Sequence, residues 1–149
     1  MIDPQSLRGK SIYLDSNILI YGIETPAHKT NIPLDILKTL FQNVQAGSTQ
    51  VITSQLSLSE VLVLPLREND RNLELTYRRM LRGTLHFSVV PITLAILNKT
   101  ADIRAHYKGI KIADAIHIAT AMEFACDLIL TADKQFRQCE REIPVSILE

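Results

Sequence analysis

The feature that most constrains the fold is a repeated pattern in which a short apolar run passes directly into a helix-like segment. Residues 11–14 are apolar and partly β-branched, which predicts a strand, and Asp15, Ser16 and Asn17 then offer side chains that begin helices. Residues 50–53 form a second run of this kind. A strand that leads straight into a helix is the beginning of an α/β unit, so we expect a parallel sheet covered by helices.

The same alternation continues along the whole chain. Ser54 is expected to cap the helix after the second strand, and in a later helix Ile112, Ile116 and Ala119 should pack inward. Further strands are expected at residues 86–90, 128–130 and 145–148, and further helices over residues 31–46, 70–82 and 112–124 and from Thr93 onward. No linker rich in Pro, Gly or Ser divides the chain. We therefore predict one domain over residues 1–149, a three-layer α/β/α sandwich around a parallel sheet.

The charge balance excludes a strongly basic nucleic-acid-binding domain, because the formal net charge is zero. Contact with nucleic acid would need a local basic surface, for which Arg78, Arg82, Lys108 and Lys111 are the candidates. The alternative for the arginines is an exposed helix face paired with neighbouring acids. Aromatic residues make up only 5% of the chain, which leaves little for base stacking.

The chain is expected to work in the cytoplasm, away from membranes. No apolar run approaches the ~20 residues of a spanning helix, and the first six residues lack the basic start and apolar run of a signal peptide. Cys126 and Cys139 show no metal-ligand spacing, and Cys126 lies in an apolar segment, which indicates a reduced, buried thiol.

Four acids lie where an open α/β sheet places its functional groups, beyond the carboxyl ends of the strands. Asp15 follows the first strand, Glu60 lies on the helix after the second, and Asp133 follows residues 128–130. Asp114 lies early in a helix of otherwise apolar neighbours. Converging carboxylates repel one another, and a divalent cation would remove that conflict. Hard oxygen ligands suit Mg²⁺ or Mn²⁺, which activate water for attack on a phosphodiester.

Each of these acids also has an ordinary interpretation when taken alone. An Asp that follows a strand is commonly a helix cap, and Glu60 could be an exposed helix residue. His117, three residues after Asp114, is interpreted as a packed helix histidine and is left out of the predicted site.

Four segments, taken in chain order, resemble the motifs of PIN domains, and in particular those of the small VapC-like ribonuclease toxins. The resemblance covers nearly the whole chain. The segments are YLDSN at 13–17, SLSEV at 57–61, ADAIHIATA at 113–121 and LTADKQF at 130–136.

The resemblance implies a five-stranded parallel sheet and one or two Mg²⁺ or Mn²⁺ ions. Asp15 and Asp114 would be the main ligands, Glu60 would complete the site or orient a water, and Asp133 would contribute directly or through water. Asn17 and Thr131 match polar motif positions and would orient the ligand oxygens, which makes six residues in all.

The resemblance also implies endonucleolytic cleavage of RNA, commonly by a dimer that a cognate antitoxin protein inhibits. PIN domains serve in RNA maturation and decay as well, so a nuclease without an antitoxin is the alternative role.

Three alternatives share part of this pattern. A phosphotransferase of the haloacid dehalogenase type needs a second Asp two positions after the first, and Asn17 stands there. A receiver or other non-catalytic α/β binding module would show an acidic pair after the first strand and a lysine after the last, and neither is evident. An inactive PIN scaffold is disfavoured because all four acids are present.

Overall fold

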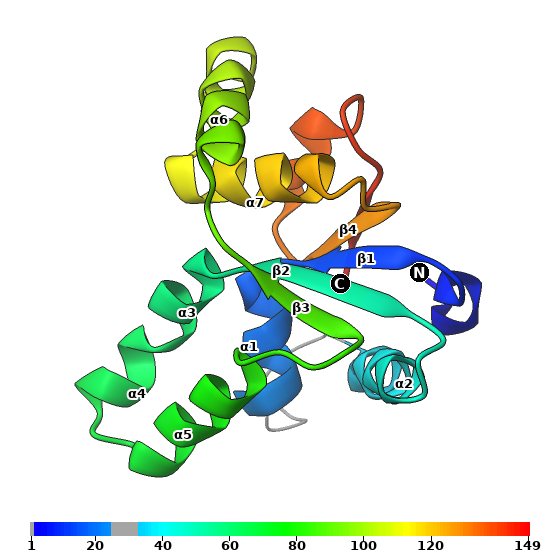
Figure 1. The fold of residues 1–149 in the computed structure, drawn as a ribbon, viewed down its shortest axis with the longest axis vertical. Coiled ribbons are helices and arrows are strands. Elements are labelled where there is room, and N and C mark those ends of the chain that lie inside the picture. The colour runs from blue at the N-terminus through cyan, green and yellow to red at the C-terminus, as the bar shows by residue number, and fades with distance from the viewer. Residues whose placement is uncertain (1, 25–32) are drawn as a thin grey trace.

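The centre of the molecule is a five-stranded sheet in which every neighbouring pair of strands is parallel (Figure 1). The computed structural model describes residues 2–24 and 33–149. The strand order is β3-β2-β1-β4-β5, so the first strand of the chain is the central one. The strands are β1 (Ser11–Leu14), β2 (Gln50–Ser54), β3 (Phe87–Val90), β4 (Leu128–Thr131) and β5 (Val145–Ile147).

Helices cover both faces of this sheet, which confirms the predicted three-layer sandwich. In Figure 1, α6 and α7 lie above the sheet, and α1, α2 and the α3–α5 segment lie below it. The α-helices of the described residues are α1 (Ser16–Glu24), α2 (Leu34–Gln45), α3 (Leu56–Val61), α4 (Val63–Arg67), α5 (Arg71–Met80), α6 (Leu94–His106) and α7 (Ile112–Glu123), and two short 3-10 helices are η1 (Pro4–Leu7) and η2 (Lys134–Cys139).

The central strand β1 supplies side chains to both layers. Successive residues of a strand point to opposite faces. Ile12 and Leu14 pack with the helices α1 and α2, whereas Tyr13 packs with α6 and α7. All three side chains are fully buried. The alternation therefore directs Asp15, two residues after Tyr13, toward the α7 side of the sheet.

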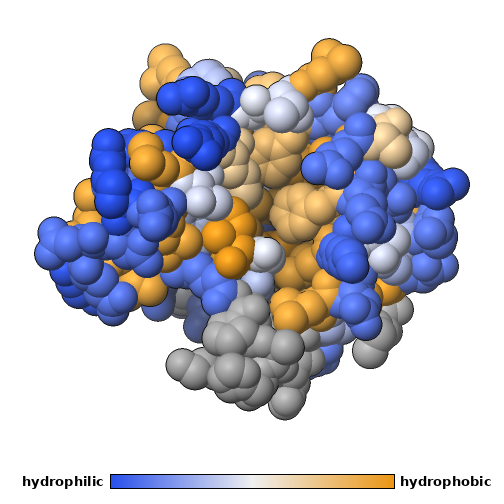
Figure 2. Space-filling view, turned by 90° about the horizontal axis from the view of Figure 1, so that it is seen from below, coloured by the Kyte–Doolittle hydropathy of each residue, from blue (hydrophilic) through white to orange (hydrophobic). Residues whose placement is uncertain are grey.

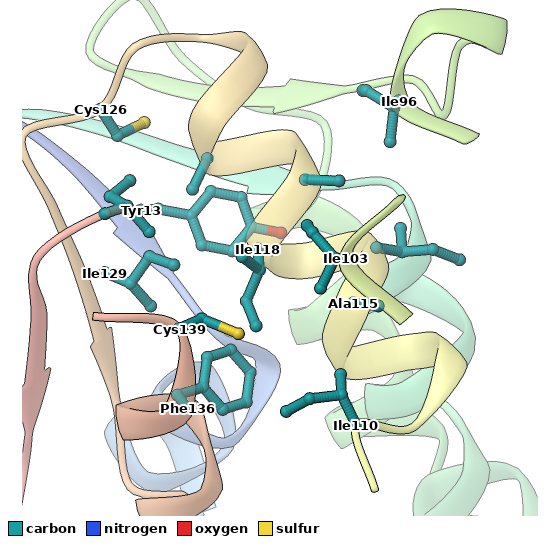
Figure 3. Close-up of a cluster of buried hydrophobic side chains, with 14 residues drawn as sticks. Tyr13, Ile96, Ile103, Ile110, Ala115, Ile118, Cys126, Ile129, Phe136 and Cys139 are labelled. Carbon is teal, nitrogen blue, oxygen red and sulfur yellow. The ribbon is translucent and has the colours of Figure 1, made fainter. Parts of the chain in front are cut away.

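The cluster on the α7 side is shown in Figure 3, where Tyr13 extends from β1 toward the helix that carries Ala115 and Ile118. Cys126 and Cys139 belong to this cluster as free, buried thiols, as predicted for Cys126. Burial raises the pKa of each thiol to about 11, so both stay protonated and behave as apolar side chains.

The helix after β2 breaks at Leu62 into α3 and α4, because Pro65 has no backbone N–H to donate to the carbonyl of Val61. One local expectation was wrong. Ile112 does not pack inward and is 57% exposed, because it is the first residue of α7 and burial of the helix begins only at Ala115.

Two further expectations can be compared only with residues 2–24 and 33–149. Helix α2 is observed from Leu34, and residues 31–32 of the predicted helix lie outside the described residues. Within residues 2–24 and 33–149, no helix combines the length and the apolar composition needed to cross a membrane.

We expect Ile129→Ala to lower the free energy of unfolding by about 2–5 kcal/mol, because Ile129 is fully buried in β4 and its truncation leaves a cavity. The matched control is Leu85→Ala at a side chain that is 85% exposed, with an effect below about 0.5 kcal/mol. Urea denaturation measures both. Equal effects would contradict the assigned core.

Candidate functional site

The carboxylate of Asp15 is buried, with 4% of the residue exposed, at the carboxyl end of the central strand. Its Oδ1 accepts a hydrogen bond from the backbone N–H of Ser16 at 2.7 Å, and its Oδ2 accepts one from the Thr131 hydroxyl at 2.6 Å. Burial, the largest influence, raises the pKa of Asp15, although these hydrogen bonds and His117 oppose it. The carboxylate is thus fixed in direction, and its ionised form is less favourable than that of an exposed aspartate.

The hydroxyl of Thr131 connects three segments of the site. It donates to Asp15 and accepts from the side-chain amide of Asn17 at 3.3 Å and from the backbone N–H of Asp133 at 3.0 Å. One donor and two lone pairs are the full capacity of a hydroxyl group. The Oδ1 of Asn17 in turn accepts from the backbone N–H of Ala132 at 3.1 Å. The end of β4 is therefore held to the beginning of α1.

Asp133 has a structural contact as well. Its Oδ1 accepts from the backbone N–H of Gln135 at 2.8 Å and so caps η2. The ordinary interpretation as a helix cap thus holds for this acid, and its Oδ2 remains for another ligand.

Glu60 reaches the same region from α3 through His117. The Nε2 of His117 lies 2.6 Å from Oε1 of Glu60 and 3.7 Å from Oδ1 of Asp15. Burial, the largest influence, lowers the pKa of His117, but the hydrogen bond to Glu60 and the charge of Asp15 outweigh it, so the net shift is upward.

Asp114 lies in the first turn of α7, where the helix dipole favours a negative charge. Desolvation raises its pKa most, and the charges of Asp15 and Asp133 raise it further. Glu60 likewise raises the pKa of Asp15. Asp15 and Asp114 therefore each lie close enough to other acids of this group for their ionisation to be disfavoured.

The donor set suits a hard divalent cation that keeps part of its water shell. Within residues 2–24 and 33–149, no lysine or arginine forms an ion pair with Asp15, Glu60, Asp114 or Asp133. Over the same described ranges, no three acidic, histidine or cysteine side chains enclose a metal position by themselves. Mg²⁺ tolerates few direct protein ligands because it retains several waters. The Oδ2 of Asp15 also keeps a lone pair beyond its hydrogen bond from Thr131, whereas Oδ1 accepts from both the backbone N–H and the hydroxyl of Ser16.

The four predicted basic residues differ in their surroundings. Lys111 directly precedes α7, and its charge lowers the pKa of Asp114, so it lies near the acids. Arg78 on α5 donates to Glu74 at 2.9 Å, which is the paired helix face of the alternative interpretation. Lys108 and Arg82 are exposed. Their contact with nucleic acid stays a prediction.

Sequence reasoning missed the contact between His117 and the acids. The histidine is fully buried, as a packed residue should be, but it contacts Glu60 and the Tyr13 hydroxyl. The available signals were a polar ring within an apolar stretch of helix and a tyrosine in the middle of a buried strand.

A model of the PIN domain family matches residues 12–142, a range that includes all four acids. The chain belongs to the PIN domain family. The motifs that carry the resemblance thus lie inside the matched range, as do α1 through η2 and all of β1 except Ser11.

Solved structures with the same fold are components of toxin–antitoxin systems. A toxin–antitoxin complex from Klebsiella pneumoniae is 25% identical with a TM-score of 0.60, and the match covers 84% of this chain and 89% of that one. VapBC2 from Rickettsia felis bound to a promoter DNA fragment is 12% identical, with a TM-score of 0.71 and coverage of 93% and 99%. FitAcB from Neisseria gonorrhoeae is 18% identical, with a TM-score of 0.64 and coverage of 90% and 95%. A sequence search of curated proteins found no match.

In metal-free protein, Asp114→Asn should become more stabilising relative to the wild type as pH rises from about 4 toward 7. The folded-state pKa of Asp114 is raised above its ordinary value of 3.8. The stabilisation of the fold by the protonated carboxyl is therefore fully present below pH 3.8, and it is lost as pH rises through the raised pKa. Asparagine does not ionise and avoids this loss.

Calorimetric melting in EDTA across this pH range measures the difference. Glu123→Gln, at an exposed acid in the last turn of the same helix, is the control and should show no such trend. A pH-independent difference for Asp114→Asn would contradict the mutual repulsion of the acids.

Proposed function

We propose that this PIN domain is a Mg²⁺- or Mn²⁺-dependent endoribonuclease that hydrolyses phosphodiester bonds in RNA, and that it is the toxin of a toxin–antitoxin pair. The observation that carries the proposal is the buried carboxylate of Asp15 beside other acids, whose charges help to raise the pKa of Asp15 and of Asp114. Membership of a nuclease family and a likeness to toxin–antitoxin structures support it. A PIN nuclease of RNA maturation or decay remains the alternative.

Asp15 and Asp114 would be the main ligands of one or two metal ions, with Glu60 and Asp133 completing the site directly or through water. A bound cation would neutralise the acids, lower the pKa of a water molecule and stabilise charge on the phosphate oxygens. Thr131 would keep Asp15 in one orientation, because it donates to Oδ2 at 2.6 Å and leaves that oxygen a second lone pair for a ligand.

The chain's own cations would bind the RNA backbone. Lys111 lies beside Asp114, and Lys108 is exposed in the same loop before α7, so both suit phosphates next to the scissile bond. Arg78 and Arg82, on and after α5, would contact phosphates farther along the strand. With zero net charge overall, binding would depend on these few contacts and would weaken with added salt.

A concave apolar surface suits the antitoxin partner. Figure 2 shows apolar side chains gathered in a hollow that hydrophilic side chains border on both sides. Two adjoining hollows of about 280 and 210 Å³ lie between α1, α2 and α5 and share Phe41. Val63, Leu64 and Leu66 of α4 add exposed apolar area. Such a surface can take the apolar side of a partner's helix.

A homodimer fits a separate group of exposed apolar side chains. Leu94 and Leu97 on α6 and Ile112 on α7 are 75%, 45% and 57% exposed, and the two helices pack against each other. Exposed apolar side chains on packed helices are available to the core of an interface, which is more apolar than the rest of a protein surface.

We expect Asp15→Asn and Asp114→Asn each to lower RNA cleavage in Mg²⁺ by at least about 100-fold, because a main ligand is lost. Wild-type cleavage should stop in EDTA and return with Mg²⁺ or Mn²⁺. The readout is cleavage of labelled RNA, with circular dichroism to check folding and Glu123→Gln as the active control. A folded Asp15→Asn variant that cuts at the wild-type rate would disprove the ligand assignment.

For the toxin role, induction of the wild-type chain should arrest bacterial growth, and Asp15→Asn should not. Co-expression of a small protein encoded directly upstream should relieve the arrest. Phe41→Glu should keep the arrest and lose the relief, because it places a charge in both hollows while leaving the acids intact. Arrest by this variant also shows that it folds. No arrest by the wild type would count against a toxin and favour an RNA-processing nuclease.

A further inference from the structure

Behind Glu60, a chain of hydrogen bonds runs through the interior of the molecule. The backbone N–H of Ser54 donates to the hydroxyl of Tyr13 at 3.2 Å, and that hydroxyl lies 2.5 Å from Nδ1 of His117. The Nε2 of His117 then lies 2.6 Å from Oε1 of Glu60. Tyr13 and His117 are fully buried, so water cannot replace either bond.

The two ends of this chain set its direction. A backbone N–H can only donate, so the Tyr13 oxygen accepts from Ser54. In the tautomer that leaves Nδ1 of His117 bare, Nδ1 accepts the hydroxyl proton of Tyr13. The proton of the imidazole then belongs on Nε2. An ionised carboxylate can only accept, so Glu60 accepts the hydrogen bond from Nε2 and is the last group of the chain.

We propose that Tyr13 and His117 are positioning residues that hold Oε1 of Glu60 and thereby present its Oε2 to the metal ion and its water. This role rests on the proposed nuclease function. It differs from plain packing because the bond ends on Glu60, whose side chain is 30% exposed, whereas the side chain of His117 is enclosed. A glutamate on α3 would otherwise move among several rotamers.

The same N–H also separates two acids. The Nε2 of His117 is 3.7 Å from Oδ1 of Asp15 as well as 2.6 Å from Glu60. A donor between two carboxylates lowers their repulsion and allows both to face one cation. His117 therefore sets the spacing of Glu60 and Asp15, not only the orientation of one of them.

Tyr13 and His117 belong to the same strand and helix segments as the proposed main ligands. Tyr13 lies two residues before Asp15 on the same face of β1, and His117 lies three residues after Asp114, about one turn along α7. Figure 3 shows Tyr13 reaching from its strand toward that helix. The two elements that would supply the principal ligands thus also carry the support for the third acid.

The first test compares His117→Leu, which keeps the volume without a donor, with His117→Gln, whose amide can still donate to Glu60. We expect His117→Leu to weaken Mn²⁺ binding in calorimetry and to slow RNA cleavage, each by about 10–100-fold, and His117→Gln to recover most of the loss. Tyr13→Phe, which removes only the hydroxyl, should fall between them. Thr120→Val, which removes a buried hydrogen bond to Ile116 in the same helix, is the control and should match the wild type.

The second test repeats His117→Leu in a Glu60→Ala background. If the histidine acts through Glu60, it should cause no further loss of Mn²⁺ affinity there. A loss of the same factor in both backgrounds, or an equal loss in Thr120→Val, would overturn the positioning role and leave a general packing effect.

A third readout needs neither metal nor substrate. Nitrogen NMR of the histidines should show the Nε2 of His117 protonated, and a bare Nε2 would overturn the assignment. A wild type that neither binds Mn²⁺ nor cuts RNA would refute the proposed function and this role with it. A wild type that does both, with no effect of His117→Leu, would refute the positioning role alone.

Discussion

The burial of one carboxylate at the end of the central strand is the constraint on which the rest of the site depends. Asp15 is almost fully enclosed, and burial is the largest of the influences that raise its pKa. Only directed donors or a cation make its ionised form tolerable. Ser16 and Thr131 supply two donors, and the other acids add repulsion instead of relief. A bound cation would stabilise the ionised form of Asp15 and reduce the repulsion among the acids.

The core and the acidic site are built from the same elements. In β1, Tyr13 faces the cluster under α7 and Asp15 follows on that same face. In α7, Ala115 and Ile118 belong to the apolar cluster, whereas Asp114 and His117 point to the acids. The precision of the site therefore comes from close-packed apolar contacts and not from a loop.

Most of the fold was predictable because its signals are local. Apolar runs followed by helix-capping residues located all five strands, and the strand rule placed the acids at one edge. The exposure of Ile112 depends on how the first turn of α7 meets neighbouring elements, which periodicity does not report. The bond from His117 to Glu60 joins residues 57 positions apart, so no local pattern could reveal it.

The contact between Asp15 and Thr131 joins the first strand to one that follows it by 116 residues. During synthesis, β1 can pair with both of its neighbours in the sheet only after β4 has been made. A chain released from the ribosome before Thr131 could not complete the surroundings of Asp15. A truncated translation product that ends before Thr131 would therefore lack the arrangement that fixes the Asp15 carboxylate.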